Sequence, residues 1–412
     1  MPSRNRPSKH RPVGRLQIEK EVYSPMNGLS AVIFVPDDCP KTGYPLPTML
    51  SPILGESLLT WLSHALFDSG IGRFFLVCHE NYLPMARQCL PPEAEVMTSG
   101  DSDPADQLHV FLSTAEESEE EVTILTGPTL YLPMLKGSAR NYESPARLVN
   151  RQTLMDALDQ EFTFSRFLHQ YSTALTDFEG FYGVESPAAF PELIPLLRRD
   201  QTLRLGRVGV DVMDPESCYI APTVRFEKGA RLLPGTIIRG SSLIRAGACI
   251  GPWSVIEDSE IGEGATVNAS QVYRSKTAAE VHIGPFAHIR EGSDLGRNAF
   301  VGSFVETKQT KLGENTRVSH LTYLGDTETG RDCNIGCGVA TANFDRVEKH
   351  STLIGDEAFI GCNTVLVAPV SIGEGAYIGA GSTITEDVPN NALGIGRNRQ
   401  SNKKDWASKH KI

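Results

Sequence analysis

The segment RVSHLTYLGD, residues 317–326, places a His, a Tyr and an Asp on one short turn of the chain. The side chain of His320 can take up and release a proton near neutral pH, which suits acid–base chemistry. The alternative for an isolated histidine is a structural role in the turn. The surrounding chain is a repeat that needs only apolar residues, so these polar side chains require another explanation.

The elements that would position this turn follow a six-residue period. Such a period is typical of a parallel β-helix, in which each hexad supplies one short strand and one turn. Gly follows four of the later apolar residues, where turns need unusual backbone angles. The apolar residues in six-step register are Ile220, Phe226, Leu232, Ile238, Ile244, Ile250 and Ile256, and then Ile354, Ile360, Leu366, Ile372, Ile378 and Ile384.

The period is interrupted where the chain is richest in polar residues. Thr307 stands at a position where the repeat has an apolar residue, and the step from Thr307 to Leu312 is five residues instead of six. The segment NFDRVEKHS, residues 343–351, is expected to be an extra loop thrown out of the β-helix. Loops inserted on a rigid repeat scaffold often carry function.

Residues 1 to about 205 lack this period and favour an α/β three-layer domain. SAVIFV (30–35), RFFLVC (73–78) and VTILT (122–126) are expected strands. Helical spacing is found at 55–70, in NRQTLMDALDQEF and in FPELIPLLRRDQ. The acidic run 116–121 is expected to be a solvated loop.

Composition is that of a soluble globular protein, with 22% charged residues and a net charge of -11 that argues against nucleic-acid binding over the whole surface. No run of 18 apolar residues occurs, and the basic, Pro-rich leader lacks the apolar region of a secretory signal. A cytoplasmic location is therefore expected. The eight cysteines lack disulfide-scaffold density or zinc spacing, so most are expected to be reduced core thiols, with no metal site.

Six ordered motifs over about residues 220–406 resemble the acetyltransferase half of a bifunctional bacterial enzyme family. That family joins glucosamine-1-phosphate N-acetyltransferase to N-acetylglucosamine-1-phosphate uridyltransferase. The resemblance implies a left-handed parallel β-helix, a homotrimer with active sites between subunits, and acetyl transfer from acetyl-CoA to an amine. The motifs are IGPFAHIREGS, VGSFVETKQTKLG, SHLTYLGD, NIGCGVATANFD, IGDEAFIGCNTVLVAPV and IGAGSTITEDVP.

The resemblance also implies roles for individual residues. His320 matches the general base. Residues matching contacts to the sugar phosphate are Arg290, Lys308, Tyr323, Asn334 and Lys349. Residues matching contacts to acetyl-CoA are Cys337, Asn343, Phe344, Cys362, Ala380 and Arg397, followed by the tail cations Arg399, Lys403 and Lys404.

Two of these positions depart from the family pattern. Phe344 stands where the family usually has Tyr, which keeps a stacking surface but loses a hydroxyl. Cys362 replaces a usual Ser, and its thiol is a weaker hydrogen-bond partner. Both changes are expected to weaken acetyl-CoA binding without abolishing transfer. Direct transfer is favoured over an acyl-cysteine intermediate.

The N-terminal half departs further from the family. A Gly-rich phosphate loop should follow the first strand, but here AVIFVPDDCPKTGYPLPTML carries Asp37 and Asp38 together with two prolines. Carboxylates repel phosphate, and proline lacks the backbone N–H that binds it. Thr48 replaces a lysine, and Pro128 follows Gly127 where a metal-binding Asp is usual. The sequence therefore predicts a degenerate nucleotidyltransferase-like domain.

These expectations divide the chain into a leader (1–25), the α/β domain (26–205), the β-helix (206–395) and a basic tail (396–412). The predicted function is N-acetylation of glucosamine-1-phosphate in the synthesis of UDP-N-acetylglucosamine, with uridyltransferase activity lost. Three alternatives remain open: an enzyme with both activities, an acetyltransferase of another amino sugar, and a non-catalytic trimeric binding protein.

Overall fold

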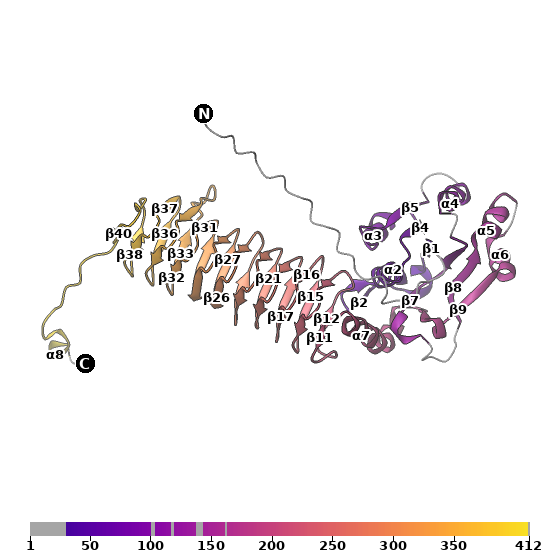
Figure 1. Ribbon diagram of the computed structural model, residues 1–412, viewed down its shortest axis with the longest axis horizontal. Helices are drawn as coiled ribbons and strands as arrows, with labels where there is room; N and C mark the ends of the chain where they lie inside the picture. Colours follow the sequence, from indigo (N-terminus) through magenta and orange to yellow (C-terminus); the bar gives the residue numbers. More distant parts are fainter. Residues whose placement is uncertain (1–29, 100–103, 117–118, 137–142, 161–162, 411–412) are drawn as a thin grey trace, which may run out of the picture.

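The computed structural model describes residues 30–99, 104–116, 119–136, 143–160 and 163–410, and the expected leader lies outside them. An α/β domain occupies one end of the molecule, and a long stack of short strands extends from it (Figure 1). The described residues contain no helix that is both long and apolar enough to cross a membrane.

The α/β domain is built on a six-stranded sheet with the order β5-β4-β1-β6-β8-β9. The first four of these strands are parallel, and β8 and β9 add antiparallel pairs. The bounds are β1 (Ser30–Val35), β4 (Arg73–Cys78), β5 (Glu95–Thr98), β6 (Glu121–Leu125), β8 (Glu143–Asn150) and β9 (Ser172–Thr176). Two small antiparallel pairs flank this sheet: β2 (Pro52–Ile53) with β3 (Glu56–Ser57), and β7 (Thr129–Tyr131) with β10 (Phe181–Gly183).

Helices cover both faces of this sheet, so the expected three-layer α/β arrangement is confirmed. Alternate side chains of β1 point to opposite faces: Ile33 packs in the core with α2, and Val32 packs in the core with α4. The helices are α1 (Cys39–Thr42), α2 (Leu58–Asp68), α3 (Leu83–Gln88), α4 (Pro104–Ser113), α5 (Arg151–Leu158), α6 (Phe164–Tyr171) and α7 (Phe190–Arg207).

The predicted strands and helices of this domain are confirmed with small shifts at their ends. The strands at 30–35 and 73–78 are β1 and β4 with the predicted bounds, and 122–126 becomes β6. The helix predicted at 55–70 is α2, which begins after Ser57 because the Ser57 hydroxyl accepts a hydrogen bond from the Thr60 N–H. The two later helical segments correspond to α5 and α7.

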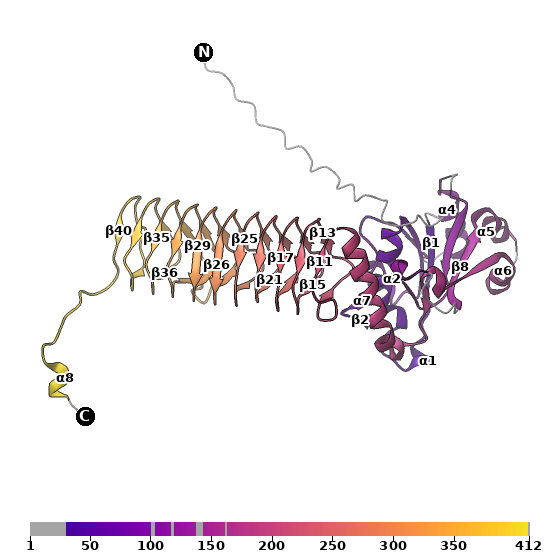
Figure 2. The ribbon, with the colours of Figure 1, turned by 60° about the horizontal axis from the view of Figure 1, so that its bottom comes forward.

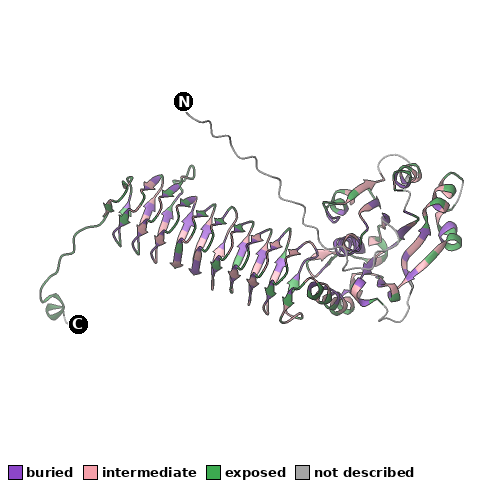
Figure 3. Cartoon of the chain, in the orientation of Figure 1, coloured by how far each residue is buried: buried purple, intermediate pink, exposed green. Residues whose placement is uncertain are grey.

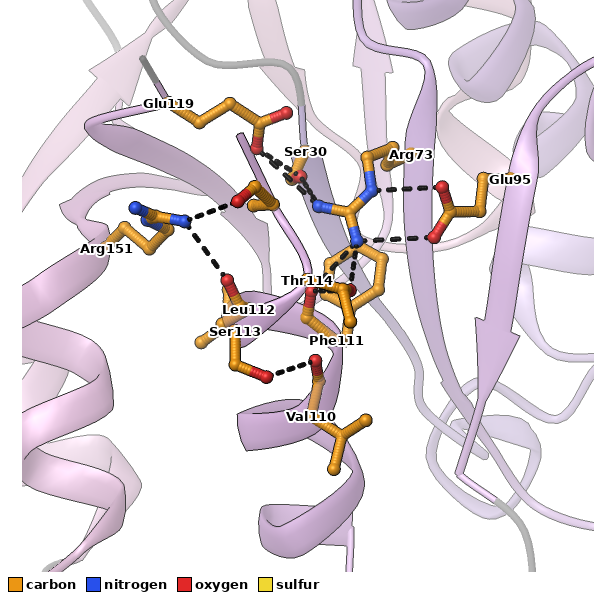
Figure 4. A network of polar contacts seen from close by, with 11 residues as sticks. Ser30, Arg73, Glu95, Val110, Phe111, Leu112, Ser113, Thr114, Glu119 and Arg151 are labelled. Atoms are coloured by element: carbon orange, nitrogen blue, oxygen red, sulfur yellow. Dashed lines mark hydrogen bonds and ion pairs between the residues drawn. The ribbon is translucent and has the colours of Figure 1, made fainter. Parts of the chain in front are cut away.

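The expectation of a solvated acidic loop at 116–121 is wrong for Glu119, which is only 3% exposed. Its carboxylate accepts a hydrogen bond from Ser30 at 2.8 Å and lies 3.8 Å from the Arg73 guanidinium (Figure 4). Arg73 also pairs with Glu95 at 3.2 Å. A buried carboxylate needs such partners, and this cation comes from a strand more than forty residues away.

Helix α7 connects the α/β domain to the β-helix (Figure 2). Arg204 forms an ion pair with Asp68 of α2 at 2.8 Å, and Gln201 donates a hydrogen bond to the carbonyl of Ile220 at 2.6 Å. The domain boundary proposed between residues 205 and 206 falls in the last turn of α7, and the first strand of the β-helix begins at Asp211.

The β-helix contains three sheets of parallel strands. The 11-stranded sheet consists of β11 (Asp211–Val212), β14 (Arg231–Leu232), β17 (Cys249–Ile250), β20 (Thr266–Val267), β23 (His282–Ile283), β26 (Phe300–Ser303), β29 (Arg317–His320), β32 (Asn334–Ile335), β35 (Phe359–Ile360), β38 (Tyr377–Ile378) and β40 (Leu393–Gly394). The 10-stranded sheet consists of β12 (Tyr219–Ile220), β15 (Ile237–Arg239), β18 (Val255–Glu257), β21 (Gln271–Tyr273), β24 (His288–Ile289), β27 (Glu306–Lys308), β30 (Tyr323–Gly325), β33 (Ala340–Ala342), β36 (Val365–Val367) and β39 (Thr383–Ile384). The 9-stranded sheet consists of β13 (Arg225–Phe226), β16 (Leu243–Ile244), β19 (Glu260–Ile261), β22 (Lys276–Thr277), β25 (Asp294–Leu295), β28 (Lys311–Leu312), β31 (Thr327–Thr329), β34 (Thr352–Ile354) and β37 (Val370–Ile372).

The hexad residues form the interior of the β-helix, which confirms the predicted repeat fold (Figure 3). Phe226, in the first coils, is only partly buried. The interruption at Thr307 does not break the stack: Thr307 pairs with Ile289 and Leu324, is fully buried, and shares a 3.0 Å hydrogen bond with Ser293. A hydroxyl with a buried partner can therefore replace an aliphatic side chain at one interior position.

The predicted insertion at 343–351 is confirmed as an extruded loop between β33 and β34. Thr327 of β31 pairs with Thr352, twenty-five residues later, whereas Arg317 pairs with Asn334 only seventeen residues later. Beyond β40 the tail is exposed and ends in the short helix α8 (Trp406–Lys409).

Candidate functional site

His320 lies at a corner of the β-helix, at the end of β29 and just before β30. It is exposed, and it stacks on Ser303 of the preceding coil. The pairing of Arg317 with Asn334 continues in register to place His320 beside Cys337 in the following coil. The 3.1 Å hydrogen bond from the Gly338 N–H to the Leu321 carbonyl carries the same alignment past the corner.

The same corner continues through two further coils. Asn363 N–H donates to the Cys337 carbonyl at 2.7 Å, and Gly381 N–H donates to the Cys362 carbonyl at 2.8 Å. Cys337, Cys362 and Ala380 therefore occupy equivalent positions in successive coils. Parallel strands lie about 4.8 Å apart, so the path from His320 to Ala380 is about 14 Å long. We name this set the corner column: His320, Cys337, Cys362 and Ala380.

Arg397 extends the corner column into the tail. Its Nε donates a hydrogen bond to the Ala380 carbonyl at 2.8 Å. The predicted base and four of the six residues predicted to contact acetyl-CoA are thus arranged along one edge. This edge exposes the imidazole of His320 and the residue Cys362, and it partly exposes Cys337.

Two predicted phosphate-binding cations lie together on the outer face of the 10-stranded sheet. Arg290 follows β24, and Lys308 ends the neighbouring strand β27. Each holds a carboxylate: the Arg290 guanidinium lies 2.7 Å from Glu306, and the Lys308 ammonium lies 3.0 Å from Glu291. We name these four residues the charge cluster.

Hydrogen bonds in the charge cluster shift the pKa of two of its residues. The hydrogen bond with Glu306 raises the pKa of Arg290, and the hydrogen bond with Lys308 lowers the pKa of Glu291. Both shifts favour the charged forms of Arg290 and Glu291. A phosphate that binds the cations must compete with Glu291 and Glu306.

Tyr323 connects the charge cluster to the start of the extruded loop. It pairs with Glu306 across the sheet, and Gly325 pairs with Lys308. A Cβ atom at Gly325 would lie 2.5 Å from the Tyr323 hydroxyl and 2.6 Å from the Asn343 amide nitrogen, so any larger residue would require these side chains to move. Gly325 therefore lies between Tyr323, a predicted sugar-phosphate contact, and Asn343, a predicted acetyl-CoA contact.

Asp326 is a residue of the candidate site to which the sequence argument assigned no role, although it belongs to the segment 317–326. Its carboxylate accepts a hydrogen bond from the Asn343 amide, and its carbonyl accepts one from the Thr352 N–H at 3.0 Å. Asp326 thereby anchors both ends of the extruded loop. The only sequence signal was its place in SHLTYLGD directly after Gly325.

The extruded loop is closed by its own side chains. The Asp345 carboxylate accepts hydrogen bonds from the N–H groups of Val347 and Glu348 and lies 2.8 Å from His350 Nε2. The hydrogen bond with His350 holds the pKa of Asp345 well below its usual range, and the same bond raises the pKa of His350. We name Asp345 and His350 the loop clasp.

Potential metal-ligand atoms of Asp345, Glu348 and His350 all lie within 4.8 Å of one another. The Asp345 carboxylate is already occupied by the hydrogen bonds of the loop clasp. We therefore interpret this cluster as a structural closure. It presents Phe344, which is 60% exposed, and Lys349, which pairs with Phe344 through a backbone bridge.

The predicted site residues divide into two groups on opposite edges of the 10-stranded sheet. The corner column precedes β30, whereas Lys308, Asn343 and Phe344 lie at or beyond the other ends of these strands. Asn334 belongs to neither group, because it lies in the 11-stranded sheet between Arg317 and Phe359. Within one chain the structure does not bring all the predicted contacts into one cavity.

The segment after β1 in the α/β domain uses its polar groups internally. Asp38 accepts a hydrogen bond from the Thr48 N–H at 2.9 Å, and Asp37 accepts one from the Cys39 N–H at 3.3 Å. The short helix α1 starts within this segment and ends at Gly43, whose φ of 75° places it in the left-handed region. Two backbone donors of this segment are therefore bound to carboxylates of the same segment.

Most of the eight thiols are not core residues, which corrects the expectation from the sequence. Cys89, Cys218 and Cys333 are buried, four others are partly exposed, and Cys362 is exposed. All eight are free thiols. Of the five thiols that are not buried, Cys337 and Cys362 lie in turns of the β-helix, Cys249 lies in a strand of it, and Cys39 and Cys78 belong to the α/β domain.

Comparison with known proteins gives one family description and a set of relatives. The description Bacterial transferase hexapeptide (six repeats) matches residues 351–386. Bifunctional protein GlmU of Brevibacillus brevis is 47% identical over 203 residues, which cover 49% of this chain and 44% of that protein. Bifunctional protein GlmU of Thermosipho africanus is 45% identical over 247 residues, covering 60% and 55% of the two chains.

Solved structures give weaker likenesses. UDP-N-acetylglucosamine acyltransferase of Francisella novicida is 18% identical with a TM-score of 0.25, over 42% of this chain and 66% of that one. Inositol-1-phosphate CTP transferase of T. maritima is 12% identical with a TM-score of 0.33, over 43% and 98%.

This chain spans about half the length of the curated relatives it matches. Within that span the identity of 41–47% is too high for a shared repeat period alone to explain. The resemblance that the sequence motifs predicted is confirmed: over about half of its length this chain is similar to the bifunctional GlmU proteins, and residues 351–386 match the bacterial transferase hexapeptide repeat.

Proposed function

We propose that this protein is an acyltransferase that moves the acetyl group of acetyl-CoA to the amine of glucosamine-1-phosphate. The observation that carries the proposal is the corner column, in which His320 is stacked in register with Cys337 and Cys362. A β-helix needs no histidine at an exposed corner. The charge cluster on the adjacent sheet face supplies the two cations that a sugar phosphate requires.

His320 acts as the general base in this proposal. The amine loses a proton as its nitrogen forms the bond to the acetyl carbon, and the exposed imidazole of His320 accepts that proton. Acetyl-CoA supplies the acetyl group: its thioester C–S bond breaks as the C–N bond forms, and CoA leaves with a proton on its sulfur. Arg290 and Lys308 hold the phosphate and thereby fix the distance between the sugar amine and His320. No cysteine forms a covalent intermediate in this scheme.

The features of the corner column fit acetyl-CoA as the second substrate. An extended chain can lie along this column of equivalent positions, where the carbonyls of Cys337, Cys362 and Ala380 already hold Asn363, Gly381 and Arg397 in place. Arg397 and the exposed tail residues Arg399, Lys403 and Lys404 offer cations for the phosphates. Phe344 offers a flat exposed surface for stacking.

The active site is completed by a second copy of the chain in a homotrimer. Support comes from the division of the predicted contacts between opposite edges of the 10-stranded sheet. An apolar ladder beside the corner column, formed by Trp253, Phe286, Phe304 and Leu321, is 59–72% exposed, and the two Phe rings stack at 5.5 Å. Contiguous exposed apolar residues are typical of an interface.

The α/β domain has lost uridyltransferase activity in this proposal. The internal hydrogen bonds of Asp37 and Asp38 support this, because they occupy donors and place carboxylates where nucleotide phosphates would bind. Its remaining role would then be structural: α7 packs it against the first coils of the β-helix.

The test measures release of free thiol from acetyl-CoA with glucosamine-1-phosphate, glucosamine-6-phosphate and glucosamine as acceptors. Saturable release with the 1-phosphate, and weak release with the others, is the expected result. Stronger release with one of the other amino sugars would identify that sugar as the acceptor. No release with any of them would favour a non-catalytic binding protein. Pyrophosphate released from UTP and N-acetylglucosamine-1-phosphate would instead establish both activities.

A further inference from the structure

Two cysteines of the corner column stand one above the other. Asn334 pairs with Phe359, and Ile335 pairs with Ile360. The same offset of 25 residues aligns Cys337 with Cys362. The 2.7 Å hydrogen bond from the Asn363 N–H to the Cys337 carbonyl keeps this register past the two residues. At the neighbouring Gly336, a Cβ atom would lie 2.6 Å from the Cys362 nitrogen, so the two backbones are in close contact.

The spacing of these two residues suits a disulfide. Adjacent parallel strands place aligned Cα atoms about 4.8 Å apart, within the range of about 4.4–6.8 Å found across disulfides. Aligned side chains point the same way, so their Cβ atoms start about 4.8 Å apart, somewhat beyond the disulfide average of about 3.8 Å. A bond formed there requires a small backbone adjustment and is readily reduced.

Both thiols are accessible to reagents. Cys362 is exposed, Cys337 is partly exposed, and neither is bridged in the structure. Cys333, four residues before Cys337, is buried, and its thiol lies 3.0 Å from the Gly355 carbonyl. Cys333 is therefore kept out of the reaction by burial, and the accessible pair is Cys337 with Cys362.

We propose that Cys337 and Cys362 form a reversible disulfide by exchange with a low-molecular-weight disulfide. The thiolate of Cys362 attacks one sulfur of the small disulfide and releases one small thiol. The thiolate of Cys337 then attacks the Cys362 sulfur of the mixed disulfide and releases the second. Two protein thiols are oxidised, one small disulfide is reduced to two thiols, and the two protons of the protein thiols pass to the released thiolates.

The disulfide would block the proposed acetyl-CoA surface. The bridge pulls the two side chains together on the coil next to His320 and changes the corner along which acetyl-CoA lies. Oxidation is therefore expected to suppress acetyl transfer, and reduction to restore it. This consequence rests on the proposed function, whereas formation of the disulfide does not.

The experiment incubates the full chain with oxidised glutathione or with dithiothreitol and maps disulfides by mass spectrometry of peptides. The same samples are assayed for acetylated sugar by mass, because thiol reagents would interfere. Expected results are a Cys337–Cys362 cross-linked peptide, a fall from eight free thiols to six, and at least a tenfold loss of transfer that dithiothreitol reverses.

Three conservative variants complete the test, each compared with its own reduced form. Cys337→Ser and Cys362→Ser are expected to lose the cross-link and the sensitivity to oxidised glutathione. Cys249→Ser, a partly exposed cysteine in another coil, is the matched control and is expected to keep both. A stable glutathione adduct on Cys362 without a cross-link, a cross-link to another cysteine, or eight remaining thiols would each overturn the proposal.

Two further outcomes separate the disulfide from the activity. A Cys337–Cys362 cross-link that leaves acetyl transfer unchanged would overturn the inhibitory effect. If the reduced protein transfers no acetyl group at all, the proposed function fails, while the peptide map still decides whether the disulfide forms.

Discussion

The two halves of this molecule use carboxylates in opposite ways. In the α/β domain, Asp37 and Asp38 accept hydrogen bonds from the backbone N–H groups of Cys39 and Thr48, so these two donors are already occupied. In the β-helix, Glu291 and Glu306 hold cations at the surface through side chains alone. A side-chain pair at the surface can be displaced by a ligand at small cost, whereas backbone donors bound to carboxylates are part of the fold.

A second difference lies in how position is specified. Residues of the β-helix are placed by stacking on the neighbouring coil, so a polar residue at a corner remains at the surface. Residues of the α/β domain are placed by a core that closes around a sheet, and polar residues there need buried partners, as Glu119 does. An exposed histidine in the β-helix is therefore a stronger indication of function than a charged residue in the α/β domain, where the charge can serve the fold.

The largest effect is expected from His320→Ala, which removes the proposed base. Acetyl transfer should fall about 100- to 10,000-fold, the usual contribution of general base catalysis. Binding of acetyl-CoA by calorimetry should be nearly unchanged, which separates loss of chemistry from loss of fold. Unchanged transfer would mean that the exposed corner residue has no catalytic role and would end the contrast between the two halves.

The next effect is expected from Lys308→Ala in the charge cluster. A charge-assisted hydrogen bond to phosphate contributes about 1.5–3 kcal/mol, so the KM for glucosamine-1-phosphate should rise roughly 10- to 100-fold. The KM for acetyl-CoA is the internal control and should stay within about twofold of wild type. Equal changes in both constants would contradict a specific phosphate contact.

A smaller effect of opposite sign is expected from Glu291→Gln. Glutamine can still accept a hydrogen bond from Lys308, but the loss of one carboxylate makes the net charge of the charge cluster more positive by one unit. Because an exposed ion pair is worth about 0.2–1 kcal/mol, the KM for the sugar phosphate should fall about two- to fivefold. The difference should shrink at high salt. A rise in KM would mean that Glu291 positions Lys308 instead of competing with phosphate.

The loop clasp should make closure of the extruded loop depend on pH. The raised pKa of His350 stabilises closure fully below its ordinary value of 6.5, and this contribution is lost as pH rises through the raised value. The lowered pKa of Asp345 stabilises closure above its ordinary value of 3.8, and this contribution is lost as pH falls through the lowered value. Closure should therefore be strongest between about pH 4 and 6.5.

Hydrogen exchange at the Val347 and Glu348 amides, which bind Asp345, measures this closure. His350→Gln should exchange faster than wild type below pH 6.5 and resemble it only above the raised pKa of His350. Comparing the two proteins at each pH removes the intrinsic pH dependence of exchange. Identical protection at all pH values would show that the clasp does not hold the loop.

The smallest effect is expected from Asp38→Ala in the α/β domain. Loss of the hydrogen bond to the Thr48 N–H should lower the free energy of unfolding of that domain by about 1 kcal/mol. Asp38→Asn, which keeps an acceptor oxygen, should lose less. Acetyl transfer should be unchanged, because the β-helix coils from β29 to β38 lie far from this domain (Figure 1). Altered transfer would show that the two halves are coupled.

The sequence was most informative where the spacing of nearby apolar residues predicts an element. The strands at 30–35 and 73–78, the helix α2 and the interior hexads all follow from such local apolar patterns. It was least informative at Glu119, whose partners Ser30 and Arg73 are brought to it by the sheet.

The sequence by itself determined the repeat, the two-part organisation and the residue types available for chemistry. Only the tertiary structure decided which of those residues meet. Thr266 pairs with His282 after sixteen residues, Gln271 with His288 after seventeen and Thr327 with Thr352 after twenty-five. These offsets depend on how each turn closes on the coil below. They place Cys337 beside Cys362 and Asn343 beside Asp326, contacts that no local pattern specifies.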